Sequence, residues 1–425
     1  MPRKAWRTSL AVLLGTLVVI AAAERTTAIT IFMPGTRAQS QEEVWQAFDR
    51  WVAEEVSPNI RLEWVFGDFD KLKTMLAAGE YLDAWMIYSG PDFFGYVENG
   101  FALDLTPYFE AEGTEYWFAP ALFDTMYKGR NFGLPVTLSH YGDLLFNRRL
   151  FDELGVAHPE ASWTTDDLTA AVSKLTRDRN GDGAADTWGI AGLHFLKAVV
   201  QFTWGAGGDI LTPDGRQNAF GRGAGSARVL EWVTDFIVRG QVDPKSMTIW
   251  QSEFMSGNTG MVVGLASTTG AGFITYAQPG YAVYEDMSKT VIPVDFETGR
   301  REIWASHGGA YMINAKAEDP DLVWRVLKTL VEHRLDEVAM KGALPSIPVI
   351  RRNFDVLMTR PELFKGDLKN RETLLIASNH LRPYMWPSTA LERAYTAEWE
   401  AVYRGEQPVS VMVENLNRLV PSLVD

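Results

Sequence analysis

Residues 28–35 read AITIFMPG, a run of apolar and β-branched residues that ends at Pro-Gly. Such a run indicates a short buried strand. The next segment, SQEEVWQAFDRWVAEE at 40–55, has apolar residues at helical spacing behind a Ser40–Glu43 capping box. A second strand-like run, NIRLEWVFG, follows at 59–67. Because a strand, a helix and a strand in this order favour parallel pairing, the chain is predicted to have an α/β fold.

The same alternation continues along the chain. Further helices are expected at 71–83, 164–178, 227–240, 318–333 and over the last 40 residues, and further strands at 84–90, 260–272 and 307–314. Thr164 is the expected N-cap of its helix, with Asp166 and Asp167 in the first turn. No segment has the composition of a flexible linker, so any two lobes must be joined by strands.

The first residues resemble an export signal. Arg3, Lys4 and Arg7 form a basic start, residues 10–23 are apolar, and small residues precede Glu24. This apolar stretch is shorter than the roughly 20 residues that span a bilayer. We therefore expect residues 1–23 to be a cleaved signal peptide rather than a membrane anchor, and the protein to be located in the periplasm.

The composition argues against several classes of protein. The chain has no cysteine, so it has neither disulfides nor a lipid anchor through cysteine. Its formal net charge of −14 disfavours nucleic acid and anionic membranes as partners. No histidine cluster has zinc spacing, and no nucleophile-elbow, P-loop or dinucleotide motif occurs. Its 54 acidic residues still leave open a pair of carboxylates for glycoside hydrolysis.

Six phrases, in order, resemble the extracellular solute-binding proteins of ATP-driven sugar importers, the class that contains maltose-binding protein. They are SGPDFFGYVENGFALDLTPYFE (89–110), GRNFGLPVTLSHYGDLLFNRRLFDELGV (129–156), SWTTDDLTAAVSKLTRDRNGDGAADTWGI (162–190), EFMSGNTGMVVG (253–264), GGAYMINAKAEDPDLVWRVLKTL (308–330) and GALPSIP (342–348). The match runs from about residue 28 to the C-terminus. Each phrase alone is weak evidence, but six in the right order behind a signal peptide are strong.

The resemblance implies an α/β, two-lobe periplasmic binding protein fold, similar to type II, with a ligand cleft and three crossover segments as its hinge. The expected ranges are 24–138 with 309–362 for the N-terminal lobe, 143–305 with 368–425 for the C-terminal lobe, and crossings near 139–142, 305–308 and 362–368. Gly142 and the pair Gly308-Gly309 suit hinge positions, or else ordinary turns.

The function implied by the resemblance is the substrate-binding component of an ABC importer. Such a protein is a monomer that captures a mono- or oligosaccharide by lobe closure and delivers it to a membrane permease, with no catalysis and no organic cofactor. Two alternatives stay open: a secreted carbohydrate-active enzyme, and a binding protein for a polyol, a glycerol-phosphate-like compound or a uronate.

Loops after the predicted strands supply the expected ligand contacts. By resemblance, polar groups come from Thr36, Arg37, Asp92 and His140, aromatic rings from Tyr88, Tyr141 and Trp204, and Ser267 stands where the family has a stacking tryptophan. The missing aromatic residue at position 267 argues against a maltodextrin. Trp204 is equally compatible with the core. His140 is also compatible with the core, but its place in a polar loop at a lobe crossing favours ligand contact. Trp250, Trp304, Tyr384 and Trp386 are weaker candidates for the cleft.

Residues 178–189, DRNGDGAADTWG, resemble the start of a calcium-binding loop. The expected ligands are Asp178, Asn180, Asp182, the carbonyl of Ala184, and Asp186. Position twelve is Gly189 instead of glutamate, so the bidentate ligand is missing and binding should be weak. We expect a structural calcium ion far from the cleft; the alternative is a solvated acidic turn.

Overall fold

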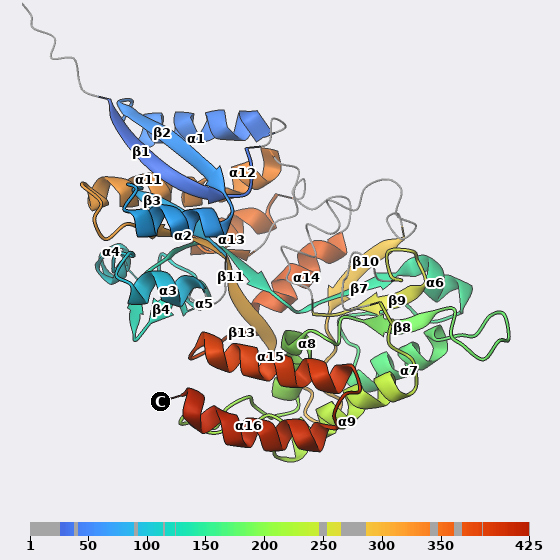
Figure 1. Ribbon diagram of the computed structural model, residues 1–425. Helices are drawn as coiled ribbons and strands as arrows, with labels where there is room; N and C mark the ends of the chain where they lie inside the picture. The colour runs from blue at the N-terminus through green and yellow to red at the C-terminus, as the bar shows by residue number, and fades with distance from the viewer. Residues whose placement is uncertain are drawn as a thin grey trace, which may run out of the picture.

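The computed structural model describes residues 26–37, 41–88, 92–113, 115–123, 125–245, 253–264, 286–340, 347–360, 368–384 and 386–424. It consists of two α/β lobes, each with its own sheet and core (Figure 1). The expected α/β two-lobe fold is therefore confirmed. The predicted signal peptide, Ser267, Trp250 and most of the crossing expected at 362–368 lie outside the described residues.

The first lobe is built on a seven-stranded sheet in the order β12-β6-β11-β3-β1-β2, with β13 paired to β11. Its strands are β1 (Thr27–Pro34), β2 (Ile60–Gly67), β3 (Ala84–Ile87), β6 (Leu134–His140), β11 (Ile303–Ile313), β12 (Ile347–Pro348) and β13 (Leu381–Pro383). Strands β1 and β2 pair in parallel from Thr27 opposite Ile60 to Pro34 opposite Gly67, as their spacing around a helix predicted.

Helices cover this sheet, and a small hairpin lies beside it (Figure 1). They are α1 (Glu42–Glu55), α2 (Phe69–Ala78), α3 (Asp92–Glu98), α4 (Thr106–Glu112), α5 (Ala119–Phe123), α11 (Pro320–Glu332), α12 (Arg334–Met340) and α13 (Arg351–Met358), and the hairpin is β4 (Met126–Tyr127) with β5 (Arg130–Asn131). The helical spacing in α1 buries Val44, Phe48, Trp51 and Val52 against the sheet, as predicted.

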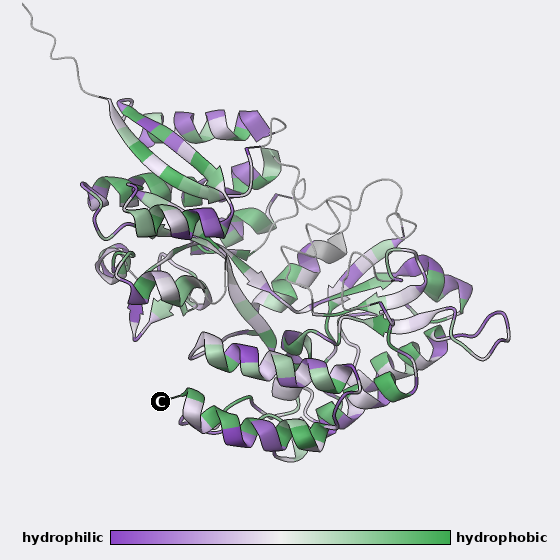
Figure 2. Cartoon of the chain, in the orientation of Figure 1, coloured by the Kyte–Doolittle hydropathy of each residue, from purple (hydrophilic) through white to green (hydrophobic). Residues whose placement is uncertain are grey.

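The second lobe has a four-stranded sheet in the order β10-β7-β9-β8. Its elements are β7 (Asp143–Asn147), β8 (Trp188–Ala191), β9 (Thr259–Val262), β10 (Met287–Val291), α6 (Arg148–Glu153), α7 (Thr165–Leu175), α8 (Leu196–Gly205), α9 (Ala224–Val238), α15 (Thr389–Tyr403) and α16 (Val409–Leu423). Thr164 caps α7 in a capping box with Asp167, which confirms the predicted helix start. Helices α15 and α16 show mixed apolar and polar surfaces, as expected for helices that cover a core (Figure 2).

Within the ranges that the structure describes, the chain passes between the lobes at three places. The first lies between β6 in the large sheet and β7 in the small one. The second is in β11, where Trp304 belongs to the second core and Ala305 to the first. The third includes α14 (Leu368–Ser378) and β13, which pairs with β11. The predicted limits of the lobes stay predictions.

Gly142 lies at the first of these segments. A Cβ atom there would lie 2.5 Å from Ile303 Cδ1, far closer than real side chains approach one another. Glycine is therefore required for the close approach of two crossing segments, which is a reason separate from the predicted hinge flexibility.

Among the described residues, no helix is both long and apolar enough to cross a membrane.

Candidate functional site

The two crossing strands meet a single face of α8 at the lobe junction. Tyr141, directly after β6, donates its N–H to the carbonyl oxygen of Trp304 in β11 at 3.0 Å. Lys197, Gln201 and Trp204 lie at positions i, i+4 and i+7 along α8 and contact these two residues. A helical face of the second lobe is thereby placed against both crossings.

Lys197 holds the ring of Tyr141. Its Nζ donates to the Tyr141 hydroxyl at 3.2 Å, lies 4.7 Å from the centre of the Tyr141 ring, and lies 5.4 Å from the Trp304 ring. An ammonium group over an aromatic face is attracted by the ring quadrupole. The partly exposed Tyr141 ring is thus fixed at the junction, where it is able to offer a flat surface to a ligand.

Aromatic side chains continue from the junction into the second lobe. Trp204 stacks on Trp304 with ring centres 5.1 Å apart, and Tyr384 packs edge-on against Trp304 at 5.0 Å. The ring centre of Trp386 lies 5.4 Å from that of Tyr384. Burial raises the pKa of the Tyr384 phenol, and the neighbouring Asp209 adds to this. Tyr384 therefore stays protonated, and within the described part of the chain its hydroxyl has no hydrogen-bond partner.

Trp204, predicted to cover a ligand, is 0% exposed. Its indole N–H donates to Asp209 Oδ1 at 3.0 Å, and the Arg382 guanidinium lies 4.4 Å over its ring. Arg382 in turn forms an ion pair with Asp209 at 2.7 Å. In this conformation Trp204 is a core residue that supports Trp304. Of the two places considered for Trp204, the cleft and the core, the structure has it in the core. Trp386, 5% exposed, is buried in the same cluster.

His140, predicted to contact a ligand, is also 0% exposed. Its Nδ1 accepts the Gly142 N–H at 3.3 Å, and its Nε2 lies 4.0 Å from Asp143 Oδ1. Burial lowers the pKa of His140 to about 4, with Lys289 adding to the lowering and Asp143 opposing it. The imidazole is thus neutral at pH 7 and packed inside the junction, with no surface open to a ligand.

The predicted contacts in the first lobe lie at the ends of its strands. Thr36 and Arg37, after β1, are exposed, and Arg37 forms an ion pair with Glu42 at 2.8 Å. Tyr88, directly after β3, is 52% exposed, with its ring edge-on to Phe69. The side chain of Asp92 and all of Ser267 lie outside what the structure describes. Tyr88 and Tyr141 are therefore the predicted rings that remain accessible, one from each lobe.

The acidic loop at 178–186 folds back on its own backbone. Asp178 accepts the N–H groups of Gly181 at 2.6 Å and Gly183 at 2.8 Å, and Asp186 accepts those of Arg179 and Asn180. No group of three or more His, Cys, Asp or Glu side chains among the described residues is placed to hold a metal. The side chains thus do not converge as a calcium site requires, and the calcium stays a prediction.

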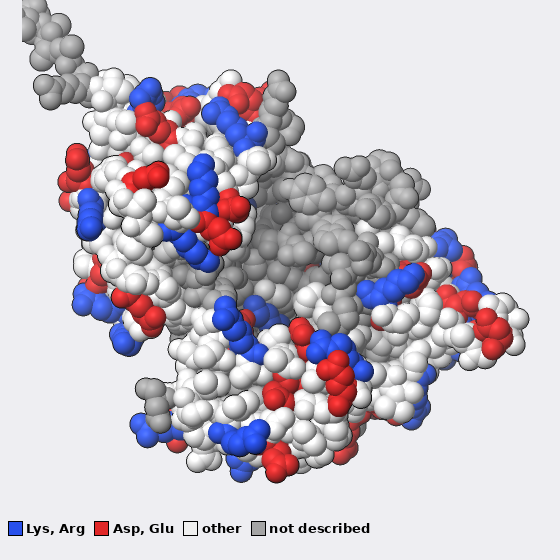
Figure 3. Space-filling model, in the orientation of Figure 1, with Lys and Arg blue, Asp and Glu red and all other residues white. Residues whose placement is uncertain are grey.

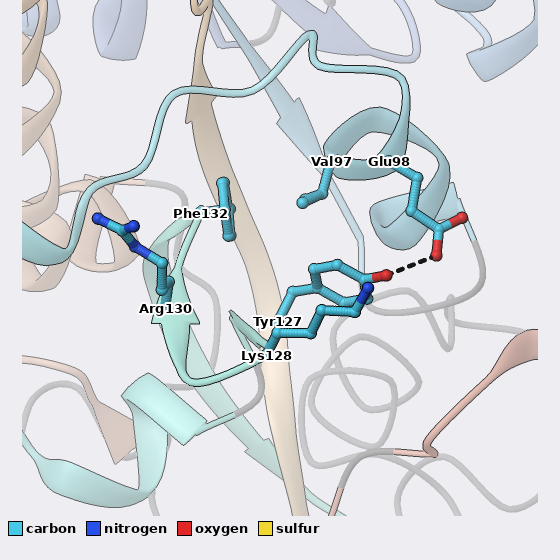
Figure 4. Close-up of a pocket in the computed structure, with 6 residues that line it drawn as sticks. All are labelled: Val97, Glu98, Tyr127, Lys128, Arg130 and Phe132. Carbon is cyan, nitrogen blue, oxygen red and sulfur yellow. Dashed lines mark hydrogen bonds between the residues drawn. The ribbon is translucent and has the colours of Figure 1, made fainter. Parts of the chain in front are cut away.

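A separate surface pocket of about 570 Å³ lies between α3 and the β4–β5 hairpin of the first lobe. Figure 4 shows Val97 and Phe132 directed into it, and Tyr127 donating a hydrogen bond to Glu98 at 2.8 Å. Lys128 stands 4.9 Å from the centre of the Tyr127 ring. None of the predicted ligand contacts lines this pocket.

Figure 3 shows the charged side chains on one face of the two lobes. Basic and acidic side chains are interspersed over both lobes on that face, without one dominant patch. A mixed surface of this kind gives no single-sign field to attract a polyanion.

Lys197, Gln201 and Arg382 are site residues that were not predicted from the sequence. The available signal was their spacing: Lys197 and Gln201 precede Trp204, itself a candidate, by about two turns and one turn of a helix. No sequence signal marked Arg382, because its place depends on the pairing of β13 with β11.

Comparisons with known proteins agree with this architecture. Residues 35–334 match the family model for bacterial extracellular solute-binding proteins. A relative from Brucella abortus (strain 2308), named as a binding protein, is 28% identical over 240 residues, which are 52% of this chain and 53% of the relative. The chain thus matches about half the length of this curated relative.

Solved structures share the fold over nearly the whole chain. An ABC substrate-binding protein from Listeria monocytogenes in complex with cycloalternan has a TM-score of 0.73 and 17% identity, covering 93% of this chain and 98% of its own. A solute-binding protein from Thermotoga lettingae bound with α-D-tagatose has a TM-score of 0.71 and 21% identity, covering 94% and 100%. With the family match spanning more than half of its residues, the chain belongs to the bacterial extracellular solute-binding protein family.

Proposed function

We propose that the protein is the substrate-binding component of an ABC importer and captures a carbohydrate between its lobes. The observation that carries this proposal is the junction, where two α/β lobes are joined by adjacent crossing segments beside an accessible tyrosine from each lobe. Solved structures with the same fold were obtained with cycloalternan, tagatose and maltose. The captured sugar would then pass to permease subunits in the membrane, after export of the protein through its signal peptide to the periplasm.

Sugar binding needs both polar and aromatic partners. Hydroxyl groups that leave water without a new partner cost about 1–3 kcal/mol each. Lys197 would supply such a partner in the second lobe, and Arg37 is a candidate in the first. The rings of Tyr88 and Tyr141 would cover the apolar C–H faces of a sugar with little loss of rotamer freedom. Contacts from both lobes favour the closed state, so the ligand shifts the population toward it.

The test is a thermal-shift screen of the mature chain with neutral mono- and oligosaccharides, polyols, glycerol phosphate and uronates. A ligand that binds the native state raises stability by RT ln(1 + [L]/Kd). Each binding compound is then recovered and chromatographed. A receptor returns it unchanged, whereas the alternative, a carbohydrate-active enzyme, would shorten it.

Tyr88→Ala should weaken binding of the compound found in that screen by about tenfold, or roughly 1.4 kcal/mol. Tyr81→Ala is the matched control, because Tyr81 precedes β3 as Tyr88 follows it, and the two are 47% and 52% exposed. Equal effects of the two changes would place the ligand away from Tyr88.

A further inference from the structure

The antiparallel pairing of β6 with β11 opens at the lobe junction. His140 lies opposite Ala305, so Tyr141 lies opposite Trp304 in the same register. Residues facing each other in a hydrogen-bonded pair normally exchange two N–H···O=C bonds. Here Tyr141 N–H donates to Trp304 O at 3.0 Å, but the reciprocal bond is replaced. Trp304 N–H instead donates to a side chain of the second lobe, Gln201.

The amide group of Gln201 is inserted between the two strands. Its Oε1 accepts the Trp304 N–H at 3.0 Å, and its Nε2 donates to the Tyr141 carbonyl oxygen at 3.1 Å. Gln201 is 1% exposed and lies in the middle of α8. Both backbone groups would lose their partner if this amide were removed, and a buried unsatisfied polar group is costly. One side chain thus completes the backbone hydrogen bonding of two crossings.

The boundary between the hydrophobic cores of the two lobes lies at the point where the Gln201 amide is inserted. Trp304 belongs to the core of the second lobe and Tyr141 packs against it, whereas Ala305 belongs to the core of the first lobe. Lys197 and Trp204 hold the rings of Tyr141 and Trp304 from the same helix. On the other side of the junction, β6 and β11 continue as a paired ladder.

From these contacts we infer that Gln201 is a positioning residue that fastens two crossing strands to the second lobe. When the lobes rotate, the backbone torsion angles therefore change on the first-lobe side of Tyr141 and Trp304, at the peptide units 140–141 and 304–305. The Tyr141 ring moves rigidly with the second lobe, so closure carries it toward the first. This inference deepens the proposed function, since it rests on lobe closure as the mode of capture.

The test compares three variants without ligand. Gln201→Met keeps an unbranched chain of similar length but removes both hydrogen bonds. Gln201→Glu keeps an acceptor for the Trp304 N–H and removes the donor to Tyr141. Thr203→Val is the matched control, because Thr203 is equally buried in α8 but its hydroxyl donates only to Val199 O, within the helix.

Two readouts are needed. Amide hydrogen exchange at Trp304 reports the local bond. Spin labels at Glu54→Cys in α1 and Glu231→Cys in α9 report the distance between the lobes; both sites are exposed, and the chain has no native cysteine to compete for the label. Far-ultraviolet circular dichroism establishes that each variant is folded.

We expect Gln201→Met to speed exchange at Trp304 at least tenfold and to broaden the interlobe distance distribution, while Thr203→Val changes neither by more than twofold. Gln201→Glu should broaden the distances but leave Trp304 protected, and it keeps the test valid if Gln201→Met does not fold. Unchanged exchange and distances in both Gln201 variants would overturn the inference. Because no ligand is used, failure to bind any sugar would contradict the proposed function without altering this result.

Discussion

Asp143 and Lys289 form an ion pair inside the junction, and breaking it should be costly. Lys289 Nζ lies 3.1 Å from Asp143 Oδ2, with the side chains 8% and 1% exposed. Lys289→Met keeps the length of the chain but leaves the Asp143 carboxylate buried without its cation. Removing one partner of a buried pair costs about 3–5 kcal/mol, because the remaining charge is uncompensated. We expect a loss of this size in the free energy of unfolding at pH 7.

A second variant and a control separate this mechanism from general damage. The double change Asp143→Asn with Lys289→Met removes both charges and should recover most of the loss, since uncharged replacement of a buried pair is often nearly neutral. Arg239→Met breaks an exposed ion pair, in which Arg239 Nε lies 2.8 Å from Asp235 Oδ1. The Arg239 and Asp235 side chains are 61% and 44% exposed. That change should cost only about 0.3–0.5 kcal/mol.

The assay is urea unfolding followed by both tryptophan fluorescence and circular dichroism. Two probes are required because lobes with separate cores can unfold separately, and only coincident transitions justify one free energy. A loss below about 1 kcal/mol for Lys289→Met, or a double variant as unstable as the single one, would show that the buried Asp143 carboxylate does not depend on Lys289 for its stability.

Three further predictions follow from buried groups and from the acidic loop. Burial lowers the pKa of His140 and of His194 from 6.5 to about 4, so below about pH 6.5 the unfolded chain binds protons that the folded chain does not. Stability should therefore fall as the pH drops from about 6.5 toward 4, and His194→Phe should flatten that fall in urea titrations at several pH values. Trp204→Ala should lower the free energy of unfolding by about 3–5 kcal/mol, because a fully buried indole is removed; a loss below 1 kcal/mol would place Trp204 outside the core. Calcium should raise the melting temperature by only about 2–4 °C, and Asp182→Ala should abolish that rise; loss of sugar binding on chelation would instead place the metal in the cleft.

Much of the fold was predictable because local patterns and the required topology agree. The β-branched run at 28–35, the helical spacing of 40–55 and the second strand at 59–67 determine a parallel β-α-β unit. Thr164 and Asp167 marked a helix start that the structure confirms. Helix α8 was not predicted as a helix. All but one of its residues are buried, so the run LKAVVQFTWG lacks the exposed polar face that marks an amphipathic helix, and Lys197 with Gln201 offered only a single spacing of one helical turn.

The site was harder to predict, because residue type does not determine which side chains the lobe junction covers. A tryptophan before a Gly-Gly turn suits either a cleft or a core, and Trp204 is enclosed by Trp304, Arg382 and Tyr384, which come from distant segments. His140 is buried because β7 and β10 bring Asp143 and Lys289 against it. Tyr88 and Tyr141, by contrast, follow strand ends directly and remain accessible.

The most direct test of sugar capture by lobe closure is small-angle X-ray scattering of the mature chain, with and without a saccharide from the screen at saturating concentration. Calorimetry on the same sample establishes saturation. We expect the radius of gyration to decrease when the sugar is bound, and the sugar to be recovered intact. Saturable binding with an unchanged radius, or no binding to any saccharide tested, would contradict sugar capture by lobe closure.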